Sequence, residues 1–235
     1  MAQRAEEKRK RREARLEAER REREAAARRR RLGLAGGAAV VLAVVAVVVV
    51  LLVGGGSDSG GGASAAGGDL PGAQTGPPPW NEGTDGLEDR LSAIGLPALT
   101  AEGTVVHIHQ HLDVIVNGKP VDVPANIGID AAQQFLSTLH THDDTGIIHV
   151  ESPSQGTFTL GQFFDVWGVP LTARRVGGLR AGGGKELRAW VNGKPVSGDP
   201  AKIRLAEHQE IVLAYGTAAQ MPKHPPSSFD FPQGL

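Results

Sequence analysis

The feature that most constrains this chain is a run of 22 residues, 32 to 53, with no charged or polar side chain. About 20 apolar residues in a helix span the core of a bilayer, so the run predicts one transmembrane helix. A cleaved signal peptide is the alternative, with Ala-Ser-Ala at 63 to 65 as its cleavage site. Signal peptides, however, have an apolar core of about 7 to 15 residues and a short basic flank, so the longer run favours an uncleaved anchor.

The charges on either side of this run predict its orientation. Residues 1 to 31 contain fourteen Lys and Arg, and no basic residue follows the run until Arg90. The positive-inside rule therefore places the N-terminus in the cytoplasm and the C-terminal domain outside, on a single-pass protein of the cell membrane.

Four segments follow from this division. Residues 1–31 are predicted to form a charged, solvated cytoplasmic helix, and 32–53 the membrane span. Residues 54–85, rich in Gly, Ser and Pro, read as a flexible linker, and 86–235 as the folded domain. As an alternative role for the cytoplasmic helix, its last four residues could bind anionic lipid headgroups; these are Arg28, Arg29, Arg30 and Arg31.

The composition of the C-terminal part excludes several kinds of site. Outside residues 1 to 31 the chain has eleven basic and nineteen acidic residues, so it lacks the basic surface that nucleic-acid binding needs. The chain contains no cysteine, which excludes disulfides and thiolate metal ligands. Nothing in the sequence identifies a protein partner.

The pattern of the domain is mainly that of strands and tight turns. Residues 105 to 116 alternate strictly between apolar and polar, and Asn117-Gly118 predicts a hairpin that pairs Val114 with Val121 and leaves the returning strand at an edge. A second hairpin, 138 to 152, would place His140 opposite His149. With short helices expected at 87–94 and 158–169, the fold class is mainly β (α+β), an antiparallel sandwich or barrel-like domain.

Six of the eight histidines lie between 107 and 149, each on the polar face of its predicted strand pair. Histidines at i and i+2 of a strand are about 7 Å apart on one face, so two His-x-His units can converge on one ion. The candidate ligands are His107, His109, His111, His140, His142, His149 and Glu151. The strongest are His109, His111, His140 and His142, with Zn²⁺ or Cu²⁺ as the ion. A pH-responsive surface and a solvated strand face are the alternatives.

Three functions fit this pattern. The first is non-catalytic metal binding, for sequestration or sensing at the cell envelope. The second is a zinc-dependent hydrolase or hydratase, which needs three protein ligands and an open position for water. The third is a cell-envelope interaction module without metal.

Three segments also carry a resemblance to a known family. "HIHQHLDVIVNGKPVDVPANIGID", "LHTHDDTGIIHVESP" and "FTLGQFFDVWGV" resemble an uncharacterised family of membrane-anchored or secreted, His-rich proteins of actinobacteria. The likeness covers roughly residues 86 to 216. It implies an exported envelope protein and supplies no activity.

Overall fold

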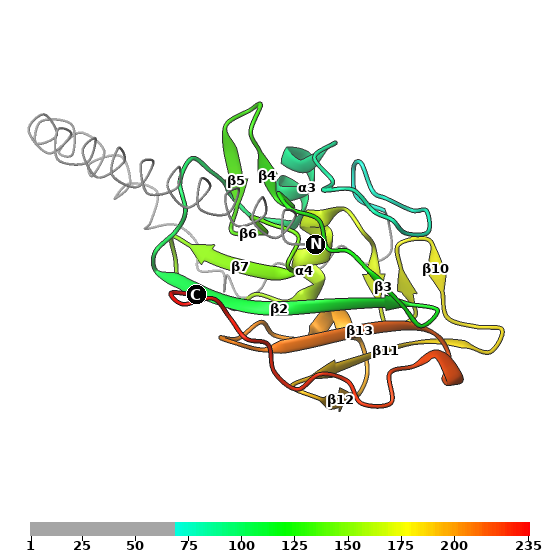
Figure 1. Ribbon diagram of the computed structural model, residues 1–235. Helices are drawn as coiled ribbons and strands as arrows, with labels where there is room; N and C mark the ends of the chain where they lie inside the picture. Colours follow the sequence, from blue (N-terminus) through cyan, green and yellow to red (C-terminus); the bar gives the residue numbers. More distant parts are fainter. Residues whose placement is uncertain (1–68) are drawn as a thin grey trace, which may run out of the picture. The chain divides into compact units, whose positions relative to one another are not determined.

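A computed structural model describes residues 69–235, which form a mainly β domain with two α-helices (Figure 1). The predicted cytoplasmic helix, with Arg28 to Arg31, the predicted membrane span and most of the predicted linker lie outside the described residues. Within residues 69–235, no helix has the length and apolarity to span a bilayer.

The largest sheet has seven strands, in the order β12-β11-β13-β2-β7-β6, with β3 also paired to β2. These strands are β2 (Val106–Val116), β3 (Lys119–Val121), β6 (Leu139–His140), β7 (Ile147–Ser152), β11 (Lys185–Val191), β12 (Lys194–Val196) and β13 (Glu210–Thr217). β13 runs parallel to β2, whereas the other pairs are antiparallel. The prediction of an antiparallel domain was therefore wrong for this pair, which joins strands too distant in sequence for a turn motif to reveal.

Two small sheets and two short 3₁₀ helices complete the domain. One sheet joins β1 (Ala98–Leu99), β5 (Phe135–Ser137) and β4 (Ile129–Asp130). The other joins β10 (Leu179–Arg180), β9 (Arg175–Val176) and β8 (Leu171–Thr172). The 3₁₀ helices are η1 (Pro200–Lys202) and η2 (Ala218–Gln220).

Local sequence signals place the hairpins as predicted. Asn117 and Gly118 have φ of 52° and 77°, the positive values that a type I′ turn requires. Val114 consequently pairs with Val121, and β3 pairs only with β2 among the described strands. In the second hairpin His140 pairs with His149, as expected.

Helix α4 (Leu160–Trp167) shares one apolar core with the apolar face of β2 and β7, and it contacts β6 and α3 (Leu87–Ile94). Thr159 caps α4 through a reciprocal pair of hydrogen bonds with Gln162, and Gly168 ends it in the left-handed conformation. Both helices lie where the sequence predicted them. The core beneath them is formed by fully buried side chains such as Phe163, Trp167 and Ile148.

The opposite face of the sheet is also covered, but by the C-terminal segment. Met221 packs with Trp190, Val212 and Ala214 in a second apolar cluster. Further along this segment, the ring of Phe229 stacks on His111 at a centroid distance of 3.8 Å. The face that carries the histidines is therefore not the solvated surface that alternation alone suggests.

The packed part of the chain begins earlier than residue 86. Trp80 is buried and meets Trp167 edge to face, and the Gln74 amide donates to the Trp167 carbonyl. Arg90 is fully buried and its guanidinium donates to backbone carbonyls that include those of Pro71 and Val166. Residues from about 70 onward thus belong to the domain rather than to a free tether.

Candidate metal centre

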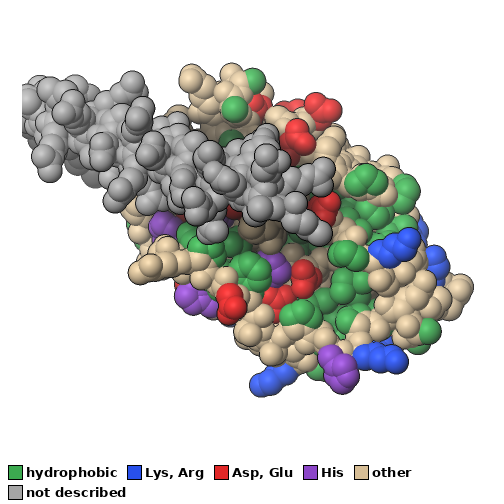
Figure 2. Space-filling model, viewed as in Figure 1, with side chains coloured by type: hydrophobic (Ala, Val, Ile, Leu, Met, Phe, Trp, Pro, Cys, Tyr) green, Lys and Arg blue, Asp and Glu red, His purple; other side chains and the backbone are tan. Residues whose placement is uncertain are grey.

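The register of three strands brings the two histidine hairpins together. β7 is paired with β2 on one side and with β6 on the other. Across β2 and β7, His109 lies opposite His149 and His107 opposite Glu151; across β6 and β7, His140 lies opposite His149. Directly opposed residues point to the same face of a sheet, so these side chains converge on one surface. Histidine and acidic side chains are visible beside one another in Figure 2.

The result is a contiguous set of five imidazole rings and one carboxylate, which we call the histidine cluster and define as His107, His109, His140, His142, His149 and Glu151. Neighbouring rings are 4.5 to 5.4 Å apart between centroids along the whole set. All members are buried except His107 and His142, whose side chains are 48% and 42% exposed. The cluster thus has a buried interior and two members that solvent reaches.

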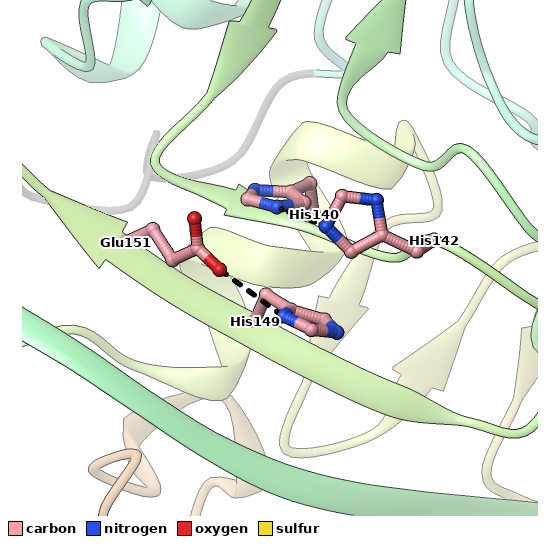
Figure 3. Close-up of side chains that lie close together, drawn as sticks. All are labelled: His140, His142, His149 and Glu151. Atoms are coloured by element: carbon pink, nitrogen blue, oxygen red, sulfur yellow. Dashed lines mark hydrogen bonds and ion pairs between the residues drawn. The ribbon is translucent and has the colours of Figure 1, made fainter. Parts of the chain in front are cut away.

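One part of the cluster has the spacing of a ligand set. His140, His142, His149 and Glu151 each offer one ligand atom, and these atoms all lie within 4.8 Å of one another. The Nε2 atoms of His140 and His142 are 3.2 Å apart (Figure 3). Ligands of a tetrahedral ion with bonds of about 2.0 to 2.1 Å are about 3.3 Å from each other. The four side chains need only a small contraction to enclose an ion.

His140 is held in the form that binds metal. Its Nδ1–H donates to the backbone carbonyl of Ser137 at 3.0 Å, and a carbonyl can only accept. The proton therefore resides on Nδ1, and Nε2 carries the lone pair that faces His142. Burial, followed by the charge of His142, lowers the pKa of His140 to about 3. This imidazole is neutral at physiological pH, as a metal ligand must be.

Glu151 is the carboxylate of the cluster. His149 Nδ1–H donates to its Oε1 at 3.2 Å, and His107 Nε2 lies 3.4 Å from the same oxygen. Burial alone would raise the pKa of Glu151, but the hydrogen bond from His149 and the adjacent imidazoles outweigh it, and the pKa is lowered. Glu151 is thus an anion within a group of histidines.

His109 occupies the interior of the cluster beside His149. Burial, and then the charges of His149 and His107, lower its pKa to about 4, so the ring is neutral at pH 7. Within residues 69–235, His109 Nε2 and Glu151 Oε2 are buried atoms with no hydrogen-bond partner. Buried polar atoms in native proteins are nearly always paired with protein, water or an ion. The two orphaned atoms fit a ligand better than a purely structural role.

The structure does not bring His111 into the cluster. Its Nδ1–H donates to Glu210 Oε2 at 2.8 Å and its Nε2–H to the Thr145 carbonyl at 2.9 Å. Burial would lower the pKa of His111, but Glu210, Asp113 and the Thr145 carbonyl outweigh it, and the pKa is raised. Both nitrogens are engaged as donors, so His111 has no lone pair for an ion in this arrangement. His111, on β2, instead contacts Glu210 of β13 and Phe229 of the C-terminal segment.

Two acidic residues near the histidines escaped sequence reasoning. Glu102, in the loop before β2, has its Oε1 3.6 Å from His142 Nε2. Burial, and then the charge of Glu151, raise the pKa of Glu102. Glu210 reaches His111 only through the parallel pairing of β13 with β2. Neither residue shows a spacing signal; proximity in sequence to His107 is the only hint for Glu102.

Comparison of this chain with protein-family models, with curated proteins and with solved structures gave no match. The chemistry of the site therefore rests on its own residues.

Proposed function

We propose that the domain binds one divalent transition metal ion, Zn²⁺ or Cu²⁺, through His140, His142, His149 and Glu151. The observation that carries this proposal is the state of His140, whose Nδ1 is fixed on the Ser137 carbonyl while its Nε2 lies 3.2 Å from His142 Nε2. Because His140 Nε2 can only accept when Nδ1 is protonated, this contact requires a proton on His142 Nε2. A metal ion would replace that proton.

The ligand set favours binding without catalysis. Three imidazoles and one carboxylate fill the four positions of a tetrahedral ion, as in closed sites, whereas catalytic zinc keeps one position for water. Nitrogen and oxygen ligands suit Zn²⁺ and Cu²⁺ alike, and the general affinity order favours Cu²⁺ wherever it is available. Sequestration or sensing of such an ion is the function that this arrangement supports best.

A zinc hydrolase is the second candidate, and one contact favours it. Glu151 Oε1 accepts a hydrogen bond from His149 Nδ1, the relation of a carboxylate that orients a metal-bound histidine rather than binding the ion. In that role Glu151 would leave the fourth position open to water on the exposed side of His142. Zinc-loaded protein that hydrolyses activated esters, with the activity lost in His140→Ala, would support this candidate over sequestration.

We further propose that this site faces the exterior of the cell. The apolar run at 32 to 53 and the concentration of positive charge before it support a single-pass anchor with a cytoplasmic N-terminus. Reporter fusions at the two ends of the chain test the orientation. Activity of an N-terminal reporter that works only outside the cytoplasm would contradict the proposed orientation.

Metal content tests the principal proposal. The full chain, purified without a histidine tag, is dialysed against zinc or copper and then against metal-free buffer before elemental analysis. We expect at least one equivalent in the wild type and loss of this ion in His140→Ala. His224→Ala is the matched control, because His224 is an exposed histidine outside the cluster and its removal should leave the content unchanged. Wild-type protein that is folded but holds no metal would refute the proposal.

A further inference from the structure

The histidine cluster is larger than one ion requires. Glu151, one of the four residues assigned above, also belongs to a second group with His107 and His109. The ligand atoms of this second group also lie within 4.8 Å of one another. The two groups share Glu151 and otherwise use different side chains. The two groups are adjacent because they lie on neighbouring strands. Strand β7 carries Glu151, strand β2 carries His107 and His109, and strand β6 carries His140.

We infer that the cluster is a two-ion centre in which Glu151 bridges the ion proposed above and a second divalent ion bound by His107 and His109. This inference rests on the proposed function, since the bridging carboxylate is common to both ions. It assigns roles to side chains that a single tetrahedral ion would leave unused.

The orphaned atoms support the second site. His109 is 3% exposed, and its Nε2 has no partner among residues 69–235. Glu151 Oε1 is approached by His149 and His107, whereas Oε2 is buried and receives no hydrogen bond from a histidine or from the backbone of the described domain; the Glu102 carboxyl is the other group within hydrogen-bonding range of Glu151. A carboxylate that gives one oxygen to each of two ions would use both of its oxygens. The unpartnered nitrogen and the unpartnered oxygen belong to the same group.

The two sites differ in how completely the protein surrounds the ion. The first has four protein ligands, most of them buried. The second has three, and one of these, His107, is 48% exposed, so water can complete its coordination. We therefore expect a tightly held ion in the first site and a weaker, exchangeable ion in the second.

Charge is consistent with this order of filling. Glu151 is the only carboxylate that belongs to both groups, and its charge must serve two divalent ions. Glu102 Oε1 lies 3.6 Å from His142 Nε2, so this further carboxyl stands beside the first group. The second ion thus meets less protein charge than the first.

Stoichiometry of the full chain distinguishes the possible outcomes. After chelator treatment, the protein is titrated with Zn²⁺ and the bound metal is counted by elemental analysis. We expect two equivalents in the wild type, with the second lost on dialysis before the first. His107→Ala and His109→Ala should each retain one equivalent, and His224→Ala should retain two.

If His109→Ala fails to fold, His107→Ala still tests the second site. His107 is half-exposed, so its replacement by Ala removes few buried contacts. One equivalent in the wild type, unchanged in His107→Ala, would overturn the second site while leaving the proposed function intact. No metal in the folded wild type would overturn both.

Copper provides an independent readout. Ions in two-metal sites lie about 3.5 to 4 Å apart, close enough for two Cu²⁺ ions to couple magnetically. The loaded wild type should show a weakened and broadened electron paramagnetic resonance signal, and His107→Ala the full signal of an isolated ion. An isolated-ion spectrum from wild-type protein that holds two equivalents would refute the shared carboxylate.

Discussion

Acidification should destabilise the metal-free domain well above the ordinary pKa range of carboxylates. His140 and His109 are buried and neutral, with pKa values of about 3 and about 4. In the unfolded chain both rings titrate near their ordinary value of about 6.5. Between these limits the unfolded state holds protons that the folded state does not, so the free energy of unfolding falls as the pH falls.

The magnitude follows from the pH interval. At pH 5, about 1.5 units below the unfolded pKa, each histidine lowers the free energy of unfolding by about 2 kcal/mol, or about 4 kcal/mol together. Asp165 acts in the opposite direction, because burial raises its pKa to about 6 and the folded state gains its proton over the same interval. Its contribution is at most about 1.4 kcal/mol, less for a partly exposed side chain, so the net loss from pH 7 to 5 is roughly 3 kcal/mol.

Among the other shifted groups near the cluster, Glu102 opposes the loss as Asp165 does, because its raised pKa lets the folded state gain a proton above the ordinary value of 4.5. His111 and Glu151 change stability at higher and at lower pH, respectively. The pKa of His111 is raised, so its stabilisation is fully present below about 6.5 and is lost only as the pH rises above that value. The pKa of Glu151 is lowered, so its stabilisation is lost only as the pH falls below the ordinary value of 4.5. The loss between pH 6.5 and 5 is thus attributed to the two buried histidines.

Urea unfolding followed by tryptophan fluorescence measures this effect in the full chain, since all three tryptophans, Trp80, Trp167 and Trp190, lie in the described domain and are buried. His140→Asn is the informative variant, because the amide can still donate to the Ser137 carbonyl but does not titrate. This variant should reduce the decrease in the free energy of unfolding between pH 7 and 5 by about 2 kcal/mol. A free energy of unfolding that is constant between pH 7 and 5 in chelator would refute the assignment of neutral buried histidines.

Three further predictions follow from single contacts. Arg90→Leu should lower the free energy of unfolding by about 3 kcal/mol or more in urea titration, because several buried carbonyls, including that of Val166, lose their donor. Thr159→Ala should cost about 1 kcal/mol in the same assay through loss of the α4 cap, and Thr159→Ser should restore most of it. Glu151→Gln should weaken zinc binding by about 10-fold to 100-fold in a competition titration if Glu151 only orients His149, and by more if it is a ligand.

The sequence predicts those parts of the fold that depend on neighbouring residues. Asn117-Gly118 determines the turn, and the turn determines that Val114 faces Val121. The same logic places His140 opposite His149, so half of the candidate site was predictable to the residue. Alternation also separates the histidines from the apolar face, because side chains in a strand alternate strictly between faces.

Pairing between distant strands could not be predicted in this way. No turn links β7 to β2, yet that pairing unites the two hairpins and opposes His109 to His149. The parallel pairing of β13 with β2 places Glu210 beside His111. His111 therefore lies outside the histidine cluster, although His107 and His111 are each two residues from His109. Burial of the linker end around Trp80 likewise depends on a contact with Trp167 that composition does not reveal.

The destabilising features of this domain are concentrated in the histidine cluster, and this location is an argument for a ligand. Helix caps, turns and the packed core are consistent with one another, as expected of a sequence that specifies a single fold. The histidine cluster departs from that consistency: two histidines are held neutral far below their ordinary pKa, and two buried polar atoms lack partners. Apolar side chains at these positions would fold more stably, so a bound cation that uses the lone pairs and the carboxylate supplies the physical reason for retaining imidazoles there.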